Sequence, residues 1–236
     1  MKKKIWIIIG FFVVLIAVFY AIIGDQLTDS SVKLGVINPE VPAFSFTDQN
    51  GNEISQRNTD GKVYVTEYFF TTCEGICPIM NANMRRVFDK YKNEPDFLIV
   101  SHTCQPEVDS VPILKAYERK MVLGNLHQKS DGEYVVTAAA DSLTPVVNPN
   151  WFFVTGDKAA LYKMARQGYI IDDGKPDTTQ IQDQFIHTQF FALVDKNRKV
   201  RGIYDGLKNK EVNQMMEDIH ALLNEKTGTK RFLGSF

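Results

Sequence analysis

The chain has 236 residues, of which 44% are hydrophobic and 23% charged, a composition typical of a globular protein with room for one well-buried domain. Its formal net charge at pH 7 is -1, so the protein has no broad basic field that would attract a polyanion. Nucleic acid is therefore not expected among its partners.

The first segment has the pattern of a membrane anchor. Three lysines, Lys2–Lys4, precede 19 uncharged and almost wholly apolar residues, Ile5–Ile23. A helix needs about 20 such residues to cross a bilayer, whereas the apolar part of a cleaved signal peptide has about 7–15. A cleaved signal is the alternative, but no small-residue cleavage site follows the apolar run. We expect residues 1–24 to be an uncleaved, single-pass anchor in a bacterial inner membrane, with the rest of the chain on the periplasmic or outer face because the lysines stay inside.

The residues after the anchor are polar and show little periodicity. We expect residues 25–40 to be a linker that holds the domain away from the membrane. Residues 41–226 are predicted to form that domain, and residues 227–236 a flexible tail. At the start of the domain, two alternating phenylalanines followed by Asn50-Gly51 predict a β-hairpin.

Strands and helices alternate through the rest of the domain. Runs of β-branched and aromatic residues predict strands, and apolar residues at helical spacing predict helices. The predicted strands are 62–70, 96–103 and 150–156; the predicted helices are 78–92, 110–122, 157–167 (with Asp157 as N-cap) and 209–224; a hairpin over 189–206 turns at Lys196-Asn197; and 126–148 and 172–183 are loops or insertions. This order predicts an α/β fold with a mixed central sheet flanked by helices.

Two of the three cysteines stand at the junction between a predicted strand and a predicted helix. In FFTTCEGICPIM, three residues separate Cys73 from Cys77, and Pro78 follows. Proline fits the first helical position and disfavours a helical residue before it, so Cys77 is predicted to be the helix N-cap. Because free N–H groups at a helix N-terminus stabilise thiolates, we expect both sulfurs to have a lowered pKa and to act as nucleophiles or ligands.

Three interpretations of this cysteine pair are open: two buried small side chains, a redox pair, or two ligands of a soft metal ion. A strand-to-helix junction lies at a sheet edge, where open α/β folds build their sites, which argues against simple burial. The Cys-x-x-x-Cys spacing is wider than the Cys-x-x-Cys of thioredoxin-type exchange, and it suits two thiolates that converge on one ion. A third ligand is then expected from elsewhere in the chain.

Four histidines could supply that ligand. His127 in a polar loop and His220 in the last predicted helix are expected to be surface residues. His102 and Cys104 would share one face at the end of a strand, which makes them a candidate second site. His187 lies at the beginning of an apolar strand. Spacing alone does not bring it to the cysteines, so a structural role and a ligand role are both open.

Four stretches of the sequence resemble the Sco/SenC family of membrane-tethered copper proteins. They are YFFTTCEGICPIMNANMRRV, FLIVSHTCQPEVDSVPILKAY, NWFFVTGDKAALYKMA and FIHTQFFALVDKNRKVRGIYDG, and the similarity covers about residues 41–223. The resemblance implies a thioredoxin-like fold that binds copper through Cys73, Cys77 and His187. The chain departs from the family after Cys104, where Gln105 stands in place of the usual aspartate before a proline. This leaves the ligand set unchanged, and Cys104 itself is expected to be buried.

The resemblance also implies a function, which is assembly of the dinuclear copper centre of cytochrome c oxidase. We expect a copper metallochaperone rather than an enzyme, with the copper-bearing subunit of the oxidase as its partner; two thiolates and an imidazole suit Cu(I) and can also hold Cu(II). A Cys73–Cys77 disulfide would remove both sulfur ligands, so loading is expected to require a thioredoxin-like reductant. The alternative is a thiol-disulfide oxidoreductase that reduces the cysteines of the receiving subunit.

Overall fold

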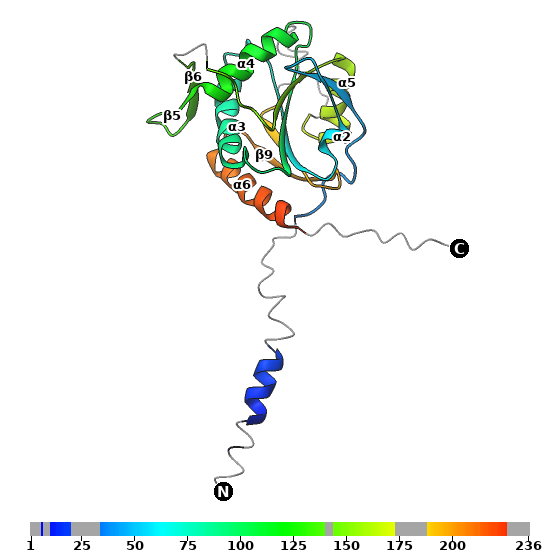
Figure 1. Cartoon of the computed structure of the whole chain (residues 1–236), viewed down its shortest axis with the longest axis vertical. Helices are drawn as coiled ribbons and strands as arrows, with labels where there is room; N and C mark the ends of the chain where they lie inside the picture. Colours follow the sequence, from blue (N-terminus) through cyan, green and yellow to red (C-terminus); the bar gives the residue numbers. More distant parts are fainter. Residues whose placement is uncertain (1–5, 7–9, 20–33, 140–143, 173–187, 226–236) are drawn as a thin grey trace, which may run out of the picture. The chain divides into compact units, whose positions relative to one another are not determined.

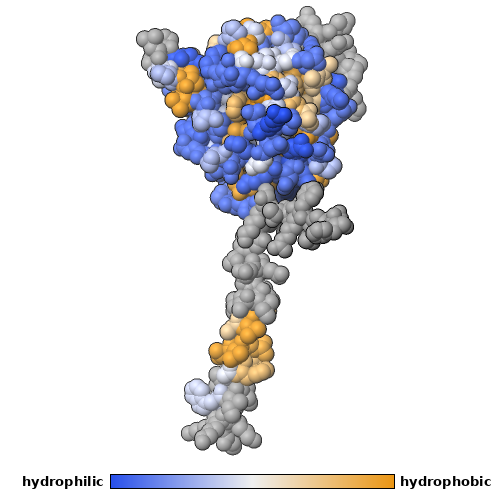
Figure 2. Space-filling view, turned by 45° about the vertical axis from the view of Figure 1, so that its right-hand side comes forward, coloured by the Kyte–Doolittle hydropathy of each residue, from blue (hydrophilic) through white to orange (hydrophobic). Residues whose placement is uncertain are grey.

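The computed structural model describes residues 6, 10–19, 34–139, 144–172 and 188–225, and the chain divides into two compact units, Met1–Lys33 and Leu34–Phe236 (Figure 1). In the first unit residues 10–19 form a helix, which Figure 2 shows as hydrophobic. The rest of the predicted anchor, apart from residue 6, lies outside the described residues. Among the described residues, no helix combines the length and apolarity that a membrane crossing requires.

Seven strands form the central sheet of the second unit, in the order β2-β1-β7-β4-β3-β8-β9 (Figure 1). Their bounds are β1 (Ser45–Asp48), β2 (Glu53–Ser55), β3 (Val63–Phe69), β4 (Phe97–Thr103), β7 (Trp151–Thr155), β8 (Phe190–Val194) and β9 (Val200–Asp205). β3, β4 and β7 are parallel neighbours, whereas the outer strands pair antiparallel. The predicted mixed sheet is therefore confirmed. Every residue of β3 is buried, because helices cover both faces of the sheet.

The helices divide between the two faces of the sheet. They are α2 (Gln56–Thr59), α3 (Cys77–Tyr91), α4 (Val111–Leu123), α5 (Lys158–Lys163) with the π-helix η1 (Met164–Tyr169), and α6 (Asn209–Asn224). We call the face covered by α3, α4 and α6 the front face and the face covered by α5 and η1 the back face. Side chains alternate along β3 as strand geometry requires: Val63, Val65 and Phe69 join the front core, and Tyr64 and Tyr68 join the back core.

The helix predicted at 157–167 is confirmed at its start and wrong at its end. The carboxylate of Asp157 accepts a hydrogen bond from the N–H of Ala160 at 2.8 Å, as an N-cap does. The α-helical part ends at Lys163, and the chain continues as the π-helix η1. Glycine at 168 weakens an α-helix, and the side chain of Asn38 donates hydrogen bonds to the carbonyl oxygens of Gln167 and Gly168, at 2.9 and 2.7 Å. The side chain of Asn38 thus binds carbonyl oxygens that backbone N–H groups would bind in a continuing α-helix.

The predicted loop at 126–148 contains two short strands. β5 (Asn125–Gln128) and β6 (Tyr134–Thr137) pair antiparallel as a separate hairpin. The short polar sequence NLHQ of β5 does not alternate, so the sequence pattern conceals it. The hairpin packs on α3, where the guanidinium of Arg86 lies 4.3 Å from the centre of the Tyr134 ring. The second predicted loop, 172–183, lies outside the described residues from 173 onward.

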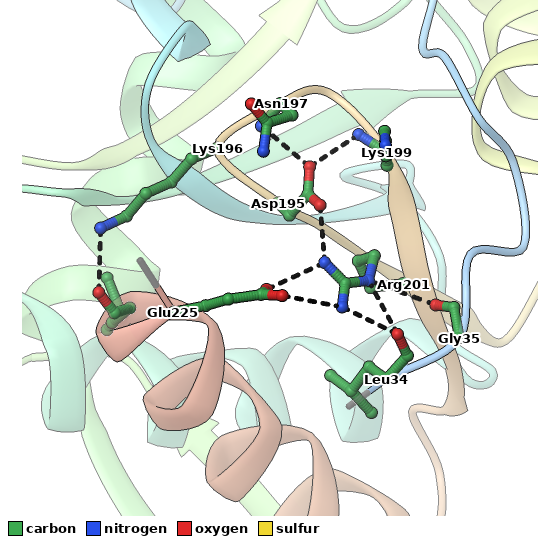
Figure 3. Close-up of polar contacts among 9 residues, drawn as sticks. Leu34, Gly35, Asp195, Lys196, Asn197, Lys199, Arg201 and Glu225 are labelled. Carbon is green, nitrogen blue, oxygen red and sulfur yellow. Dashed lines mark hydrogen bonds and ion pairs between the residues drawn. The ribbon is translucent and has the colours of Figure 1, made fainter. Parts of the chain in front are cut away.

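The hairpin between β8 and β9, which turns where it was predicted to turn, holds the first and last described residues of the domain (Figure 3). Arg201 donates hydrogen bonds to the carbonyl oxygen of Leu34 at 2.8 Å, to Asp195 at 2.8 Å and to Glu225 at 2.9 Å. We call these four residues the Arg201 clamp. Residues 34–40, which the sequence assigned to the linker, therefore contact β9. The clamp lies at the end of the sheet where β3 begins, since Val200 pairs with Val194 and Val194 with Tyr64.

Candidate thiol and metal site

The two cysteines of the motif lie where β3 passes into α3. β3 ends at Phe69, and the N–H of Cys73 donates to the carbonyl oxygen of Phe70 at 3.2 Å. Cys77 is the first residue of α3 and Ile76 is its N-cap, with helical backbone angles. The predicted N-cap position is therefore wrong by one residue. A proline disfavours helical backbone angles in the residue before it but does not exclude them. Here the carbonyl oxygen of Ile76 already accepts hydrogen bonds from the N–H groups of Ile79 and Met80.

The structure brings the two sulfurs together in the reduced state. Cys73 is partly exposed and Cys77 is buried, and no disulfide joins them. The pKa of Cys77 is raised far above its ordinary value, first by the hydrogen bond with Cys73 and then by burial, while the backbone of Phe70 opposes the shift. The expected lowering of this pKa is therefore wrong for the metal-free protein. Because Cys77 keeps its proton at neutral pH, any metal bound by this sulfur must displace it.

A buried aspartate fixes the beginning of the segment between β3 and α3, residues 70–76, which we call the cysteine loop. Asp109, which is fully buried, accepts a hydrogen bond from the hydroxyl of Thr71 at 2.5 Å and another from the hydroxyl of Thr103. These contacts tie the loop after β3 to the end of β4 and to the segment before α4. Sequence reasoning did not identify Asp109, although an acidic residue in a short polar connection between a strand and a helix was a possible signal.

Two further buried polar contacts lie on the front face of the sheet, one between Asn81 and Tyr117 and one between Glu67 and Ser101. The side chain of Asn81 donates to the hydroxyl of Tyr117 at 2.7 Å, and the Tyr117 ring stacks on Phe69 with their centres 5.1 Å apart. Glu67 is fully buried and accepts a hydrogen bond from the hydroxyl of Ser101 at 2.7 Å. Burial raises the pKa of Glu67 to about 8. The sequence analysis did not single out Glu67, whose one available signal was a carboxyl group within an apolar strand.

The third predicted ligand, His187, lies outside the described residues. Thr188, which follows it, is buried, and β8 begins two residues later. β8 runs antiparallel to β3, so the end at which β8 begins is the end at which β3 enters the cysteine loop. Among the described residues, no group of three histidine, cysteine, aspartate or glutamate side chains is placed to hold a metal ion.

The other histidines and the third cysteine do not form a second metal site within the described residues. His102 is fully buried; its Nδ1 lies 3.0 Å from the hydroxyl of Thr66, its ring stacks on Tyr68, and burial lowers its pKa to about 3. Cys104 is buried as expected, and burial raises its pKa. His127 and His220 are exposed, as predicted.

Comparison with known proteins identifies the family. The family model for SCO1/SenC matches residues 37–126 and 129–224. The chain belongs to the SCO1/SenC family. A SCO1 protein homologue of Bacillus subtilis (strain 168) is 28% identical to this SCO1/SenC protein over 198 residues, which are 83% of this chain and 86% of that protein.

Solved structures of Sco proteins share the fold. BsSco, described as a member of the Sco family of cytochrome c oxidase assembly proteins with a disulfide switch, has a TM-score of 0.60 and 27% identity, over 82% of this SCO1/SenC chain and 98% of that one. Yeast Sco1 with copper bound has a TM-score of 0.52 and 19% identity, over 83% and 95% of the two chains, and this likeness shows the fold alone. The predicted thioredoxin-like fold of Sco proteins is confirmed.

Proposed function

We propose that this SCO1/SenC protein is a copper carrier that binds copper through Cys73, Cys77 and His187 and delivers it to the copper centre of cytochrome c oxidase. The observation that carries the proposal is the pair of reduced sulfurs that lie within hydrogen-bonding reach of each other at the exit of β3. Two thiolates and an imidazole form a set of soft and borderline ligands that suits Cu(I) and also binds Cu(II). Copper is then a cargo, and the protein has no catalytic turnover of its own.

The position of His187 in the chain supports the proposed ligand set. His187 directly precedes the buried Thr188 in the sequence, and β8 begins two residues after Thr188. Since β8 is hydrogen bonded to β3, a side chain at this end of β8 starts from the same edge of the sheet as the cysteine loop. The partly exposed Cys73 leaves the proposed site accessible to a receiving protein, which allows transfer by ligand exchange.

A thiol-disulfide oxidoreductase is the second candidate function. The adjacent sulfurs favour it, because two thiols in hydrogen-bonding reach can form a disulfide with loss of two electrons and two protons. The same oxidation would abolish copper binding, so the carrier requires reduction before loading, and we assign this step to a thioredoxin-like reductant. The partner in either case is the copper-bearing oxidase subunit.

The decisive experiment compares copper binding by His187→Ala with binding by the wild type. The full chain in detergent is reduced, and its Cu(I) affinity is measured by competition with a chromophoric chelator. We expect His187→Ala to weaken binding roughly 100-fold. His127→Ala is the matched control and should bind as the wild type does, because His127 is exposed and hydrogen bonded only to Thr137 among the described residues. An unchanged affinity in His187→Ala contradicts the ligand set, and rapid disulfide turnover without metal supports the oxidoreductase.

We further propose that residues 1–24 anchor the protein in the inner membrane, with the domain on the periplasmic or outer face. The support is the apolar run Ile5–Ile23 behind three lysines. Protease treatment of intact spheroplasts tests this arrangement. The domain should be degraded under these conditions, whereas protection until the membrane is disrupted contradicts the orientation.

A further inference from the structure

The ends of β3 and β4 lie side by side where the chain enters the cysteine loop. Phe69 pairs with Thr103 in the parallel register, and the N–H of Cys104 donates to the carbonyl oxygen of Phe69 at 2.8 Å. From this point β3 continues as the cysteine loop, and β4 continues as a turn that leads to α4. In that turn the N–H of Asp109 donates to the carbonyl oxygen of Gln105 at 2.8 Å. The backbone of Asp109 is therefore held by the turn in which it lies.

The carboxylate of Asp109 reaches from this turn to the cysteine loop. Its Oδ1 accepts a hydrogen bond from the hydroxyl of Thr71 at 2.5 Å, and its Oδ2 accepts one from the N–H of Thr71 at 3.3 Å. Its Oδ2 also accepts a hydrogen bond from the hydroxyl of Thr103 at the end of β4. Because both oxygens of a carboxylate accept and neither donates, one side chain can bind all these donors at once. Asp109 is fully buried, so water does not compete for the contacts.

Thr71 is the second residue of the turn that places Cys73. The N–H of Cys73 donates to the carbonyl oxygen of Phe70 at 3.2 Å, which closes a β-turn between these two residues. Asp109 thus binds both the main chain and the side chain of Thr71 within that turn. Cys77, in contrast, is the first residue of α3 and takes its position from the helix. The position of the Cys73 sulfur relative to the Cys77 sulfur therefore depends on the contact between Thr71 and Asp109.

We propose that Asp109 is a positioning residue of the thiol pair, which acts through Thr71 to hold Cys73 where it can form a disulfide with Cys77. The inference deepens the proposed function and rests on it, because the carrier and the oxidoreductase both depend on the oxidation state of this pair. With oxidised glutathione as the oxidant, the two thiols lose two electrons and two protons and form one S–S bond, and two glutathione thiols are released. Thiols that are held close together form this bond more readily than thiols on a mobile loop, because less conformational freedom is lost.

The test is the equilibrium of the full chain in detergent with reduced and oxidised glutathione at neutral pH. Free thiols are trapped by alkylation, and mass spectrometry measures the oxidised fraction of the peptide that contains Cys73 and Cys77. Thr71→Val keeps the shape of the side chain and removes the hydroxyl donor, whereas Asp109→Asn replaces one accepting oxygen with an NH₂ group. We expect each substitution to lower the equilibrium constant for the disulfide roughly tenfold. Thr71→Ser, which keeps the hydroxyl, should have the constant of the wild type.

Thr103→Val is the matched control, because it removes the other hydroxyl that donates to Asp109 and leaves the contact with the cysteine loop in place. A merely structural role would destabilise the reduced and oxidised forms alike, so urea unfolding would detect it and the disulfide constant would not change. An unchanged constant in Thr71→Val or in Asp109→Asn overturns the proposal, as does an equal decrease in Thr103→Val.

Two further outcomes remain distinguishable. If Asp109→Asn does not fold, the comparison of Thr71→Val with Thr71→Ser and Thr103→Val decides the proposal. No step of the experiment uses copper. Failure of the chain to bind copper therefore contradicts the proposed carrier, while the disulfide constant still tests the role of Asp109.

Discussion

A fully buried carboxyl group on the front face of the sheet and a fully buried imidazole on the back face lie on neighbouring parallel strands. Glu67 on β3 belongs to the front face, and His102 on β4 belongs to the back face. Burial perturbs both, raising the pKa of Glu67 to about 8 and lowering that of His102 to about 3. His102 is stacked on Tyr68 and contacts Thr66, whereas Glu67 accepts a hydrogen bond from the hydroxyl of Ser101. At both positions the perturbed pKa therefore identifies burial, and it does not by itself mark a functional group.

Replacing one thiol on each face should give the largest difference between the two faces. Cys73→Ser on the front face should lower Cu(I) affinity on the order of 1,000-fold, because it removes a proposed ligand. Cys104→Ser on the back face, where the thiol is buried in the core, should leave the affinity nearly unchanged and cost only stability. Chelator competition measures both. A large loss of affinity in Cys104→Ser would show that the back face takes part in metal binding.

The next prediction is that His102 and Glu67 make the free energy of unfolding depend on pH in opposite directions. His102 binds a proton readily only when unfolded, so the free energy of unfolding should fall as pH drops below about 6.5, by about 1.4 kcal/mol per pH unit. Glu67 keeps its proton in the folded state up to a pKa of about 8, so the same free energy should fall as pH rises from about 4.5 to about 8, with a similar slope.

Single substitutions separate the two slopes, which oppose each other between about pH 4.5 and about pH 6.5. His102→Gln should remove the acid slope, and Glu67→Gln should remove the alkaline one. Urea unfolding of the full chain, followed by tryptophan fluorescence at several pH values, gives both. If either substitution leaves the profile of the wild type in place, the corresponding group is not the source of the slope.

The smallest predicted effect concerns Asp109, which joins the cysteine loop to β4. Asp109→Ala leaves the hydroxyl groups of Thr71 and Thr103 without their acceptor and should cost about 1–3 kcal/mol of stability. It should also increase amide hydrogen exchange in residues 71–77 more than elsewhere. Asp157→Ala, which removes a helix cap on the back face, is the control, and an equal increase at the loop in that variant would contradict a local role for Asp109.

The strands and most helices could be predicted because their signal is local. The buried strand β3 is a run of apolar and β-branched residues, and Asp157 carries an ordinary N-cap signal. The exceptions have causes outside the local pattern: η1 receives hydrogen bonds from the distant Asn38, and β5 is too polar to stand out without its partner. Contacts with residues distant in the sequence therefore determine the conformation of η1 and β5.

The candidate site could be predicted in part. The spacing of Cys73 and Cys77 before a proline was sufficient to indicate a site, and the family resemblance supplied His187. The protonation state of Cys77 could not be predicted, because it follows from a neighbouring sulfur and from burial rather than from the helix end. The surroundings of Glu67 and Asp109 likewise combine several elements that are distant in the sequence. His187 stays a prediction, since it lies outside the described residues.

The Arg201 clamp has a mechanical consequence. It holds Leu34 and Glu225 at the end of the sheet where β3 begins (Figure 3). The cysteine loop lies at the other end, about 20 Å away along the seven residues of β3. A pull that reaches the domain through the residues before Leu34 is resisted first by the guanidinium of Arg201 and by β9. β3, which leads into the cysteine loop, is thereby shielded from tension, and the two cysteines keep their positions when the residues upstream move.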